Sequence, residues 1–281
     1  MDYCGHEDLE IITALCSQWH FAKVHLDDED VSSTTSSVHS EWTKTLKNLR
    51  LDALTSLSIY VKDKDAWPVF QSWTTPSLKH LECSQISLLA KLKFIVPLES
   101  LKVELEYSKF PVKLLSFLTT VAAASLVQLS VTFKAQETDD DEVVYAVLDR
   151  LFLPRIEMRN LRALCIDVRP DSMDYFNNVE RLMGRIEMPQ LTTFRLSAHA
   201  KTVLCYEMES WLRQIQNKAY YSLKEVSVKV HSGPETTQRR KIEIRLQQHL
   251  RKTTKVDVQF VEEDRQYSIS CLEDLLFGRD C

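Results

Sequence analysis

Nine segments of the chain share one pattern of hydrophobic and polar positions. Each has the form L-x-x-L-x-h, in which h is apolar and the two leucine positions and h act as anchors. The second and third anchors are apolar in all nine copies, and the residue between them is polar everywhere except at Cys165. Side chains alternate between the two faces of a strand, so the pattern predicts nine strands with one buried and one solvent-facing side. The first anchors are Phe21, Leu54, Leu78, Leu98, Leu126, Leu161, Leu191, Leu223 and Thr253.

Most of the segments between these strands have apolar residues at helical spacing. The stripes begin at or just after five points: Pro111, the acidic run 139–142, Asp171, Leu204 and Ile242. A helix between successive strands makes the strands parallel, and the polar strand face leaves only one side for the helices. The fold class expected is α/β, an irregular curved solenoid with a concave parallel sheet and helices on the convex side. We expect a single domain over residues 1–281, with a Ser/Thr-rich surface loop at residues 31–45.

The spacing of the repeats and the residues that introduce them indicate a family resemblance. The first anchors are 29 residues apart on average, at the upper edge of the range of about 20–29 residues for leucine-rich repeats. The segment Leu9–Trp19 ends in Ser-x-Trp and leads into the first strand, and Pro76, Pro97 and Pro189 introduce later strands as Pro-x-Leu or Pro-Leu. In these respects the chain resembles the leucine-rich-repeat domain of fungal F-box/leucine-rich-repeat proteins.

The resemblance implies a horseshoe-shaped domain of about nine irregular leucine-rich repeats that recognises the substrate of a ubiquitin ligase. In that family an N-terminal F-box, marked by a Leu-Pro-acidic signature, docks the adaptor Skp1. No such signature occurs in this sequence. The resemblance therefore covers the repeat domain without the F-box, and binding of Skp1 stays an open question.

Composition excludes several classes of function. The chain has 35 basic and 40 acidic residues, a net charge of −5, which gives no global attraction to nucleic acid or anionic lipid. It has only four glycines, no two of them within five residues, so the glycine-rich loops that bind nucleotides are absent and no cofactor is expected. No apolar stretch is long enough to predict a membrane span. Seven cysteines without framework spacing favour a reduced, cytoplasmic or nuclear location.

Motifs for metal binding and catalysis are weak. Cys4, His6, Cys16 and His20 contain metal-ligating groups, but only Cys16 and His20 have a regular spacing, and a zinc site needs four ligands at tight spacing. The acidic run 139–142 lacks the ligand spacing of a calcium loop and fits a helix N-terminus better. The sequence has no G-x-S-x-G motif. We therefore expect neither a metal site nor catalytic residues, and the protein is predicted not to be an enzyme.

One segment, residues 235–255, is strongly basic. Its arginines and lysines include Arg239, Arg240 and Arg245, beside an apolar stripe of Ile242, Leu246 and Leu250. A basic face can follow nucleic-acid phosphates. The segment lacks interleaved aromatic residues and belongs to an acidic chain, so we favour a solvated helix over a nucleic-acid surface.

The polar face of the strands is the remaining candidate site. Curved solenoids bind proteins over such surfaces, and the function expected is non-enzymatic recognition of a protein partner, hypothetically the substrate of an F-box-type ubiquitin ligase. The alternative is a stand-alone leucine-rich-repeat scaffold or inhibitor without a ligase, and a third, less favoured, is nucleic-acid binding through residues 235–255. The predicted partner-binding residues are Ser58, Tyr60, Glu82, Lys102, Glu104, Asp167, Arg195, His199, Lys229 and His231.

Overall fold

The structure is a computed structural model that describes part of the chain. The chain divides into two compact units, Met1–Val103 (unit 1) and Glu104–Cys281 (unit 2), and each is described by itself. The expectation of one domain over residues 1–281 stays a prediction. The described residues are 16–26, 46–61, 67–84, 97–106, 114, 117–119, 124–134, 155–168, 179, 182–199, 203, 206–219, 221–231, 236–250 and 253–261.

Unit 1 contains parallel strands in sequence order. The strands β1, β2, β3 and β4 follow one another as hydrogen-bonded neighbours, and the printed pairings are all parallel. The last of them, β4, continues past Val103 into the numbering of unit 2. The elements are the 3₁₀ turn η1 (Cys16–Gln18), β1 (Phe21–Leu26), β2 (Ser56–Val61), the short helix α3 (Trp67–Gln71), β3 (His80–Cys83) and β4 (Ser100–Glu106).

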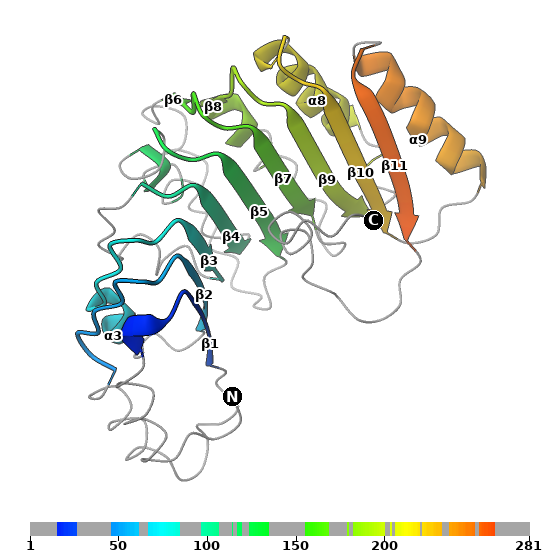
Figure 1. Ribbon diagram of the computed structural model, residues 1–281. Coiled ribbons are helices and arrows are strands. Elements are labelled where there is room, and N and C mark those ends of the chain that lie inside the picture. The colour runs from blue at the N-terminus through cyan, green and yellow to red at the C-terminus, as the bar shows by residue number, and fades with distance from the viewer. Residues whose placement is uncertain are drawn as a thin grey trace, which may run out of the picture. The chain divides into compact units, whose positions relative to one another are not determined.

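Unit 2 repeats this arrangement with longer strands. Its main strands have the order β5-β7-β9-β10-β11 and are parallel, and β6 pairs with β8 as a separate two-stranded sheet. Figure 1 shows α8 and α9 together on one side of the strands. The elements are β5 (Gln128–Lys134), β6 (Ile156–Glu157), β7 (Ala163–Val168), β8 (Ile186–Glu187), β9 (Thr193–His199), α8 (Tyr206–Lys218), β10 (Glu225–His231), α9 (Thr236–His249) and β11 (Lys255–Val261).

The nine predicted strands are all present, which confirms an α/β fold with parallel strands. Eight of them begin at the residue immediately before the second anchor, the exception being β1, which begins at Phe21. In the seven inner repeats all three anchors are buried and form the core, because burying an apolar side chain stabilises the fold by about 1.5–3 kcal/mol. The prediction was wrong for the two edge repeats: Phe21 and Thr253 are exposed, and Val24, Val256 and Val258 are only partly buried. Leu78, Leu98, Leu161 and Leu191, all first anchors, are fully buried.

The predicted helices are confirmed where the structure describes them. In α8 the stripe residues Met208, Trp211 and Ile215 are buried, and in α9 Ile242 and Leu246 are buried. Of the two stripes after Pro111 and Asp171, the described apolar residues are also buried: Leu114, Phe117, Leu118, Val179, Leu182 and Met183. The acidic run 139–142 and the predicted loop 31–45 lie outside the described residues.

Backbone hydrogen bonds join each repeat to the next just before the strands begin. The carbonyl oxygen of Arg162 accepts hydrogen bonds from the N–H groups of Thr192 and Thr193, and the carbonyl of Thr192 accepts from Lys224 and Glu225 in the same way. The Thr192 hydroxyl also donates to the Arg162 carbonyl at 3.0 Å. One backbone carbonyl thus accepts hydrogen bonds from two successive N–H groups of the next repeat. Because these bonds lie at the start of the strand, they fix the register of that strand.

The short strands β6 and β8 were not predicted. Each begins a segment of the form I-E-M-x-x-L, at Ile156 and at Ile186, and this exact repeat was the available signal. Lys218, at the end of α8, holds the second segment: its Nζ donates to the carbonyls of Met183 and Ile186, both at 2.7 Å, and lies 3.3 Å from a carboxylate oxygen of Glu187. Burial lowers the pKa of Lys218, although Glu187 acts in the opposite direction.

Candidate protein-binding face

The strand residues between the buried anchors form what we call the polar face of each unit. In unit 1 the polar face consists of Lys23, Ser58, Tyr60, Glu82 and Lys102. In unit 2 its central part consists of Gln128, Ser130, Ala163, Cys165, Asp167, Arg195, Ser197, Ser227, Lys229 and His231. All ten predicted site residues lie on strands. His199 is at the end of β9, in register with His231, and its side chain lies outside the described part.

In unit 1 the polar face is held together by one carboxylate. Ser58, Glu82 and Lys102 are register partners on β2, β3 and β4. The Ser58 hydroxyl donates to Glu82 Oε2 at 3.0 Å, and Lys102 Nζ lies 2.5 Å from Glu82 Oε1 as an ion pair. Burial acts to raise the pKa of Glu82, but hydrogen bonds from Lys102, Tyr60 and Ser58 together outweigh it, and the pKa lies below its ordinary value. Lys23 Nζ lies 5.4 Å from the centre of the Tyr60 ring.

The expectation that this whole face is wet was wrong for several residues. Lys102 and Glu104 on β4 are each only 5% exposed, and Ser58 is buried as well. The side chains of Ser58 and Lys102 both contact Glu82, which is their register partner on β3. These contacts between neighbouring strands cover the side chains. Alternation predicts which face a side chain is on, but lateral packing decides how much water reaches it. Lys102 and Glu82 therefore act mainly inside unit 1, and they are poor contacts for a partner.

In unit 2 three charged side chains of the polar face are uncommitted, which means that they form no ion pair or hydrogen bond with the described residues. Arg195 lies between Cys165 and Ser227 in register, and Ser197 lies between Asp167 and Lys229. Arg195, Asp167 and Lys229 are partly exposed, and among the described residues none of their side chains is in an ion pair or hydrogen bond. Three charges of both signs on neighbouring strands are thus available to an incoming surface.

A serine and a histidine also meet on this face. The Ser197 hydroxyl and His231 Nε2 are 2.9 Å apart, a distance that suits a nucleophile and its base. Ser197 is buried, however, and the residues around it lie in mid-strand between β7 and β10. Their N–H groups serve the strand ladders and are not free to hold an oxyanion. The pair therefore fits a structural hydrogen bond better than a catalytic dyad.

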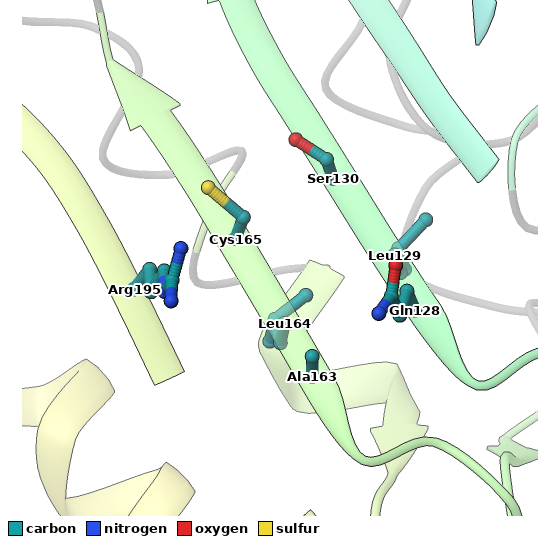
Figure 2. A pocket seen from close by; sticks show the side chains of 7 residues that line it. All are labelled: Gln128, Leu129, Ser130, Ala163, Leu164, Cys165 and Arg195. Carbon is teal, nitrogen blue, oxygen red and sulfur yellow. The ribbon is translucent and has the colours of Figure 1, made fainter. Parts of the chain in front are cut away.

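A small hollow lies beside Arg195. Figure 2 shows it between β5 and β7, where Ser130, Ala163 and Cys165 have short side chains. Gln128 and Arg195 border it, and its volume of about 10 Å³ holds roughly one water molecule. Small-molecule sites are typically about 300–1,000 Å³, so this hollow can take part of a partner's side chain but not a metabolite.

The remaining chemical candidates find no support in the described residues. Cys4 and His6 lie outside them, and no group of three or more histidine, cysteine or acidic side chains gathers as a metal site in the part described. Within the same residues, no helix is both long and apolar enough to cross a membrane.

Within the basic segment 235–255, residues Thr236–His249 form the helix α9, and two of its arginines pack against the protein. The guanidinium of Arg239 lies 4.8 Å from the centre of the Phe260 ring, and Arg245 Nε lies 2.5 Å from a carboxylate oxygen of Glu209 on α8. Arg240 and Lys241 are exposed. Part of the positive charge thus joins α9 to α8 and β11, which weakens the interpretation of α9 as a nucleic-acid surface.

We expect Arg245→Ala to lower the free energy of unfolding by about 1 kcal/mol, because it breaks a partly buried ion pair between two helices. Arg240→Ala, on the same helix, is the matched control and should change it by less than about 0.5 kcal/mol. Urea denaturation followed by circular dichroism measures both. If Arg245→Ala leaves stability unchanged but weakens salt-sensitive retention on RNA, the nucleic-acid hypothesis is favoured instead.

Sequence reasoning missed some members of the face. Lys23 and Gln128 occupy the same alternating positions as the predicted residues, and strand register would have found them. Comparison of the chain with models of known protein families gives no match, and comparison with curated proteins gives no significant match.

Proposed function

We propose that the chain is a non-enzymatic recognition module of the leucine-rich-repeat type, which binds a protein partner through the polar face of unit 2. One observation carries the proposal: Arg195, Asp167 and Lys229 lie on adjacent parallel strands, partly exposed, with no ion pair among the described residues. Protein interfaces use such charges to set register and specificity. The repeat anchors and the carbonyls that link successive repeats support a leucine-rich-repeat solenoid.

The biological setting follows from the resemblance alone. We propose that the module recognises the substrate of an F-box-type ubiquitin ligase, and the alternative is a stand-alone scaffold or inhibitor that uses the same face. Affinity purification separates them: recovery of Skp1 and a cullin supports the first, and a different partner, captured reproducibly without them, supports the second.

The binding face is tested by a triple variant, Asp167→Ala with Arg195→Ala and Lys229→Ala. We expect it to weaken capture of the partner by at least about tenfold, since it removes the uncommitted charges of the face. The matched control, Arg213→Ala with Arg240→Ala and Lys241→Ala, removes exposed charges from α8 and α9 and should capture the partner like the wild type.

The fold of both variants is checked by circular dichroism and by the thermal midpoint. Undiminished capture by the folded face variant contradicts the proposal, and so does equal loss in the control variant.

A further inference from the structure

The strand β11 leaves the sheet of unit 2 with an open edge. It is the last strand in the order β5-β7-β9-β10-β11, and no strand of the described part lies along its far side (Figure 1). Val256, Val258 and Phe260 occupy core-facing positions of β11, yet each of them is partly exposed. Their register partners on β10 are three valines with 0% exposure. The apolar side of the sheet is therefore only partly covered at β11.

The same three residues direct their backbone groups away from β10. The N–H of Lys255 donates to the carbonyl of Lys224, so Lys255 faces β10. Successive residues of a strand direct their N–H and C=O groups to opposite edges. Val256, Val258 and Phe260 therefore present N–H and C=O groups to the outer edge. An accessible edge with free backbone groups and apolar side chains is a template for pairing with another strand.

The outer edge of β1, in unit 1, has a protection that β11 lacks. The carbonyl of His20 accepts hydrogen bonds from the start of β2, so alternation makes Lys23 the central residue that faces the outer edge of β1. A lysine in an edge strand discourages pairing, because a second strand would have to approach its charge. The corresponding central residue of β11 is Val258, which carries no charge.

The outward groups of β11 match those of a second β11 in antiparallel orientation. A two-fold axis at Val258 places this residue opposite Val258 of the second copy, and Val256 opposite Phe260. All three residues face outward, so each opposed pair exchanges both of its backbone hydrogen bonds. Their side chains also lie on the same face of the joined sheet, where each partly exposed apolar group contacts another.

The alternate positions of β11 allow the same register. Asp257 falls opposite Gln259 of the second copy, and Lys255 opposite Val261, so no like charges are opposed. Within one copy Gln259 Nε2 already donates to the Asp257 carboxylate at 3.1 Å. An axis at Asp257 would bring two carboxylates directly together, which is unfavourable. The axis at Val258 is also the one that pairs all seven residues of the strand.

We propose that two copies of this chain form a two-fold dimer by antiparallel pairing of their β11 strands, with Val258 at the axis. A single strand supplies both sides of this pairing, so the partner that fits it is a second copy. Closed two-fold dimers are the commonest protein assemblies. The inference is independent of the proposed function, because it uses the edge of β11 and not the polar face.

Sedimentation velocity of the full-length protein over a range of concentrations tests the dimer. Pairing of one short strand buries less than the roughly 1,600 Å² of a standard interface, so we expect a dissociation constant on the order of micromolar. Val258→Lys and Val258→Glu each oppose like charges at the axis and should raise this constant at least about tenfold. An equimolar mixture of the two variants should dimerise again, since a lysine then faces a glutamate. Val258→Thr is the matched control and should dimerise like the wild type.

A disulfide gives a second measurement with conservative substitutions. The Cα atoms of a hydrogen-bonded antiparallel pair are about 5.5 Å apart, within the range of about 4.4–6.8 Å that a disulfide spans. Mild oxidation should therefore link Val258→Cys to itself as a dimer on a non-reducing gel. Val256→Cys is the control: the two copies of this residue would be about 13 Å apart and should link no more than the wild type does.

Three results would overturn the inference. The first is a wild type that stays monomeric at every concentration, and the second is a dimer that folded Val258→Lys and Val258→Glu form as well as the wild type does. The third is growth beyond a dimer that Lys23→Glu prevents, because it would show that β11 pairs with β1 of the next copy. Circular dichroism checks the fold of each variant, and equal linking of Val258→Cys and Val256→Cys would contradict the register.

Discussion

Replacing Phe194 with alanine is expected to lower the free energy of unfolding by about 3–5 kcal/mol. Phe194 is the second anchor of β9 and is only 1% exposed. Its register neighbours on β7 and β10 are Leu164 and Val226, both buried. Removal of the ring leaves a cavity among apolar side chains of three strands, and a strand ladder on both sides prevents the backbone from closing it. Urea denaturation of the full-length protein measures the loss.

Two matched substitutions separate this effect from a general sensitivity to aromatic changes. Phe194→Leu keeps most of the apolar volume and should cost less than about 1.5 kcal/mol. Tyr221→Ala removes an aromatic side chain that is 90% exposed, and should change stability by about 0.5 kcal/mol or less. A loss from Tyr221→Ala as large as that from Phe194→Ala would contradict the assignment of Phe194 to the core.

Hydrogen exchange shows how far the damage spreads. Repeats of this kind are stabilised by their neighbours, so a weakened repeat weakens the adjacent ones. The backbone amides of β7, β9 and β10 are expected to lose protection together in Phe194→Ala. Loss confined to β9 would mean that the strands of unit 2 are less strongly coupled than the ladder of carbonyls at Arg162 and Thr192 indicates.

The positions of the strands could be predicted because two periodic signals coincide. The L-x-x-L spacing marks the turn and the start of each strand, and the period of two marks its buried side; in β10 the burial alternates along the whole strand. A helix with a full apolar stripe, such as α8, gives an equally strong signal. These features depend on residues close together in sequence, and a single chain is enough to recognise them.

The burial and the interaction partners of the polar residues could not be predicted in the same way. Ser58 and Glu82 are 24 residues apart, and nothing local indicates that their side chains meet. The sequence likewise does not distinguish Lys102, which is paired and buried, from Lys229, which is partly exposed on the same kind of position. Both are lysines flanked by buried apolar residues of a strand. The difference lies in the register partners: Lys102 lies beside Glu82, whereas Lys229 lies beside Ser197 and Gln259, which are uncharged.

The buried pair Lys102–Glu82 provides the second large effect. Lys102→Met is expected to lower the free energy of unfolding by about 2–3 kcal/mol, because it leaves the Glu82 carboxylate in a shielded site without its cation. The side chain of Lys102 is 7% exposed and that of Glu82 is 22% exposed, so the cost should fall below that of a fully buried pair. The double variant Lys102→Met with Glu82→Gln removes both charges and should regain most of the loss.

Acid pH distinguishes an electrostatic cause from a packing defect. In the wild type the folded-state pKa of Glu82 is below its ordinary value, so its contribution to stability is complete above the unfolded pKa and is lost as the pH falls through the folded one. In Lys102→Met we expect burial to outweigh the remaining hydrogen bonds from Tyr60 and Ser58 and to raise that pKa, so that protonation of Glu82 relieves the variant. The stability gap between the two proteins should therefore narrow as the pH falls from about 6 to about 4. The opposite result is a difference in the free energy of unfolding that does not depend on pH and is equally large for the double variant. It would show that Lys102 stabilises the fold through its aliphatic chain and not through its charge.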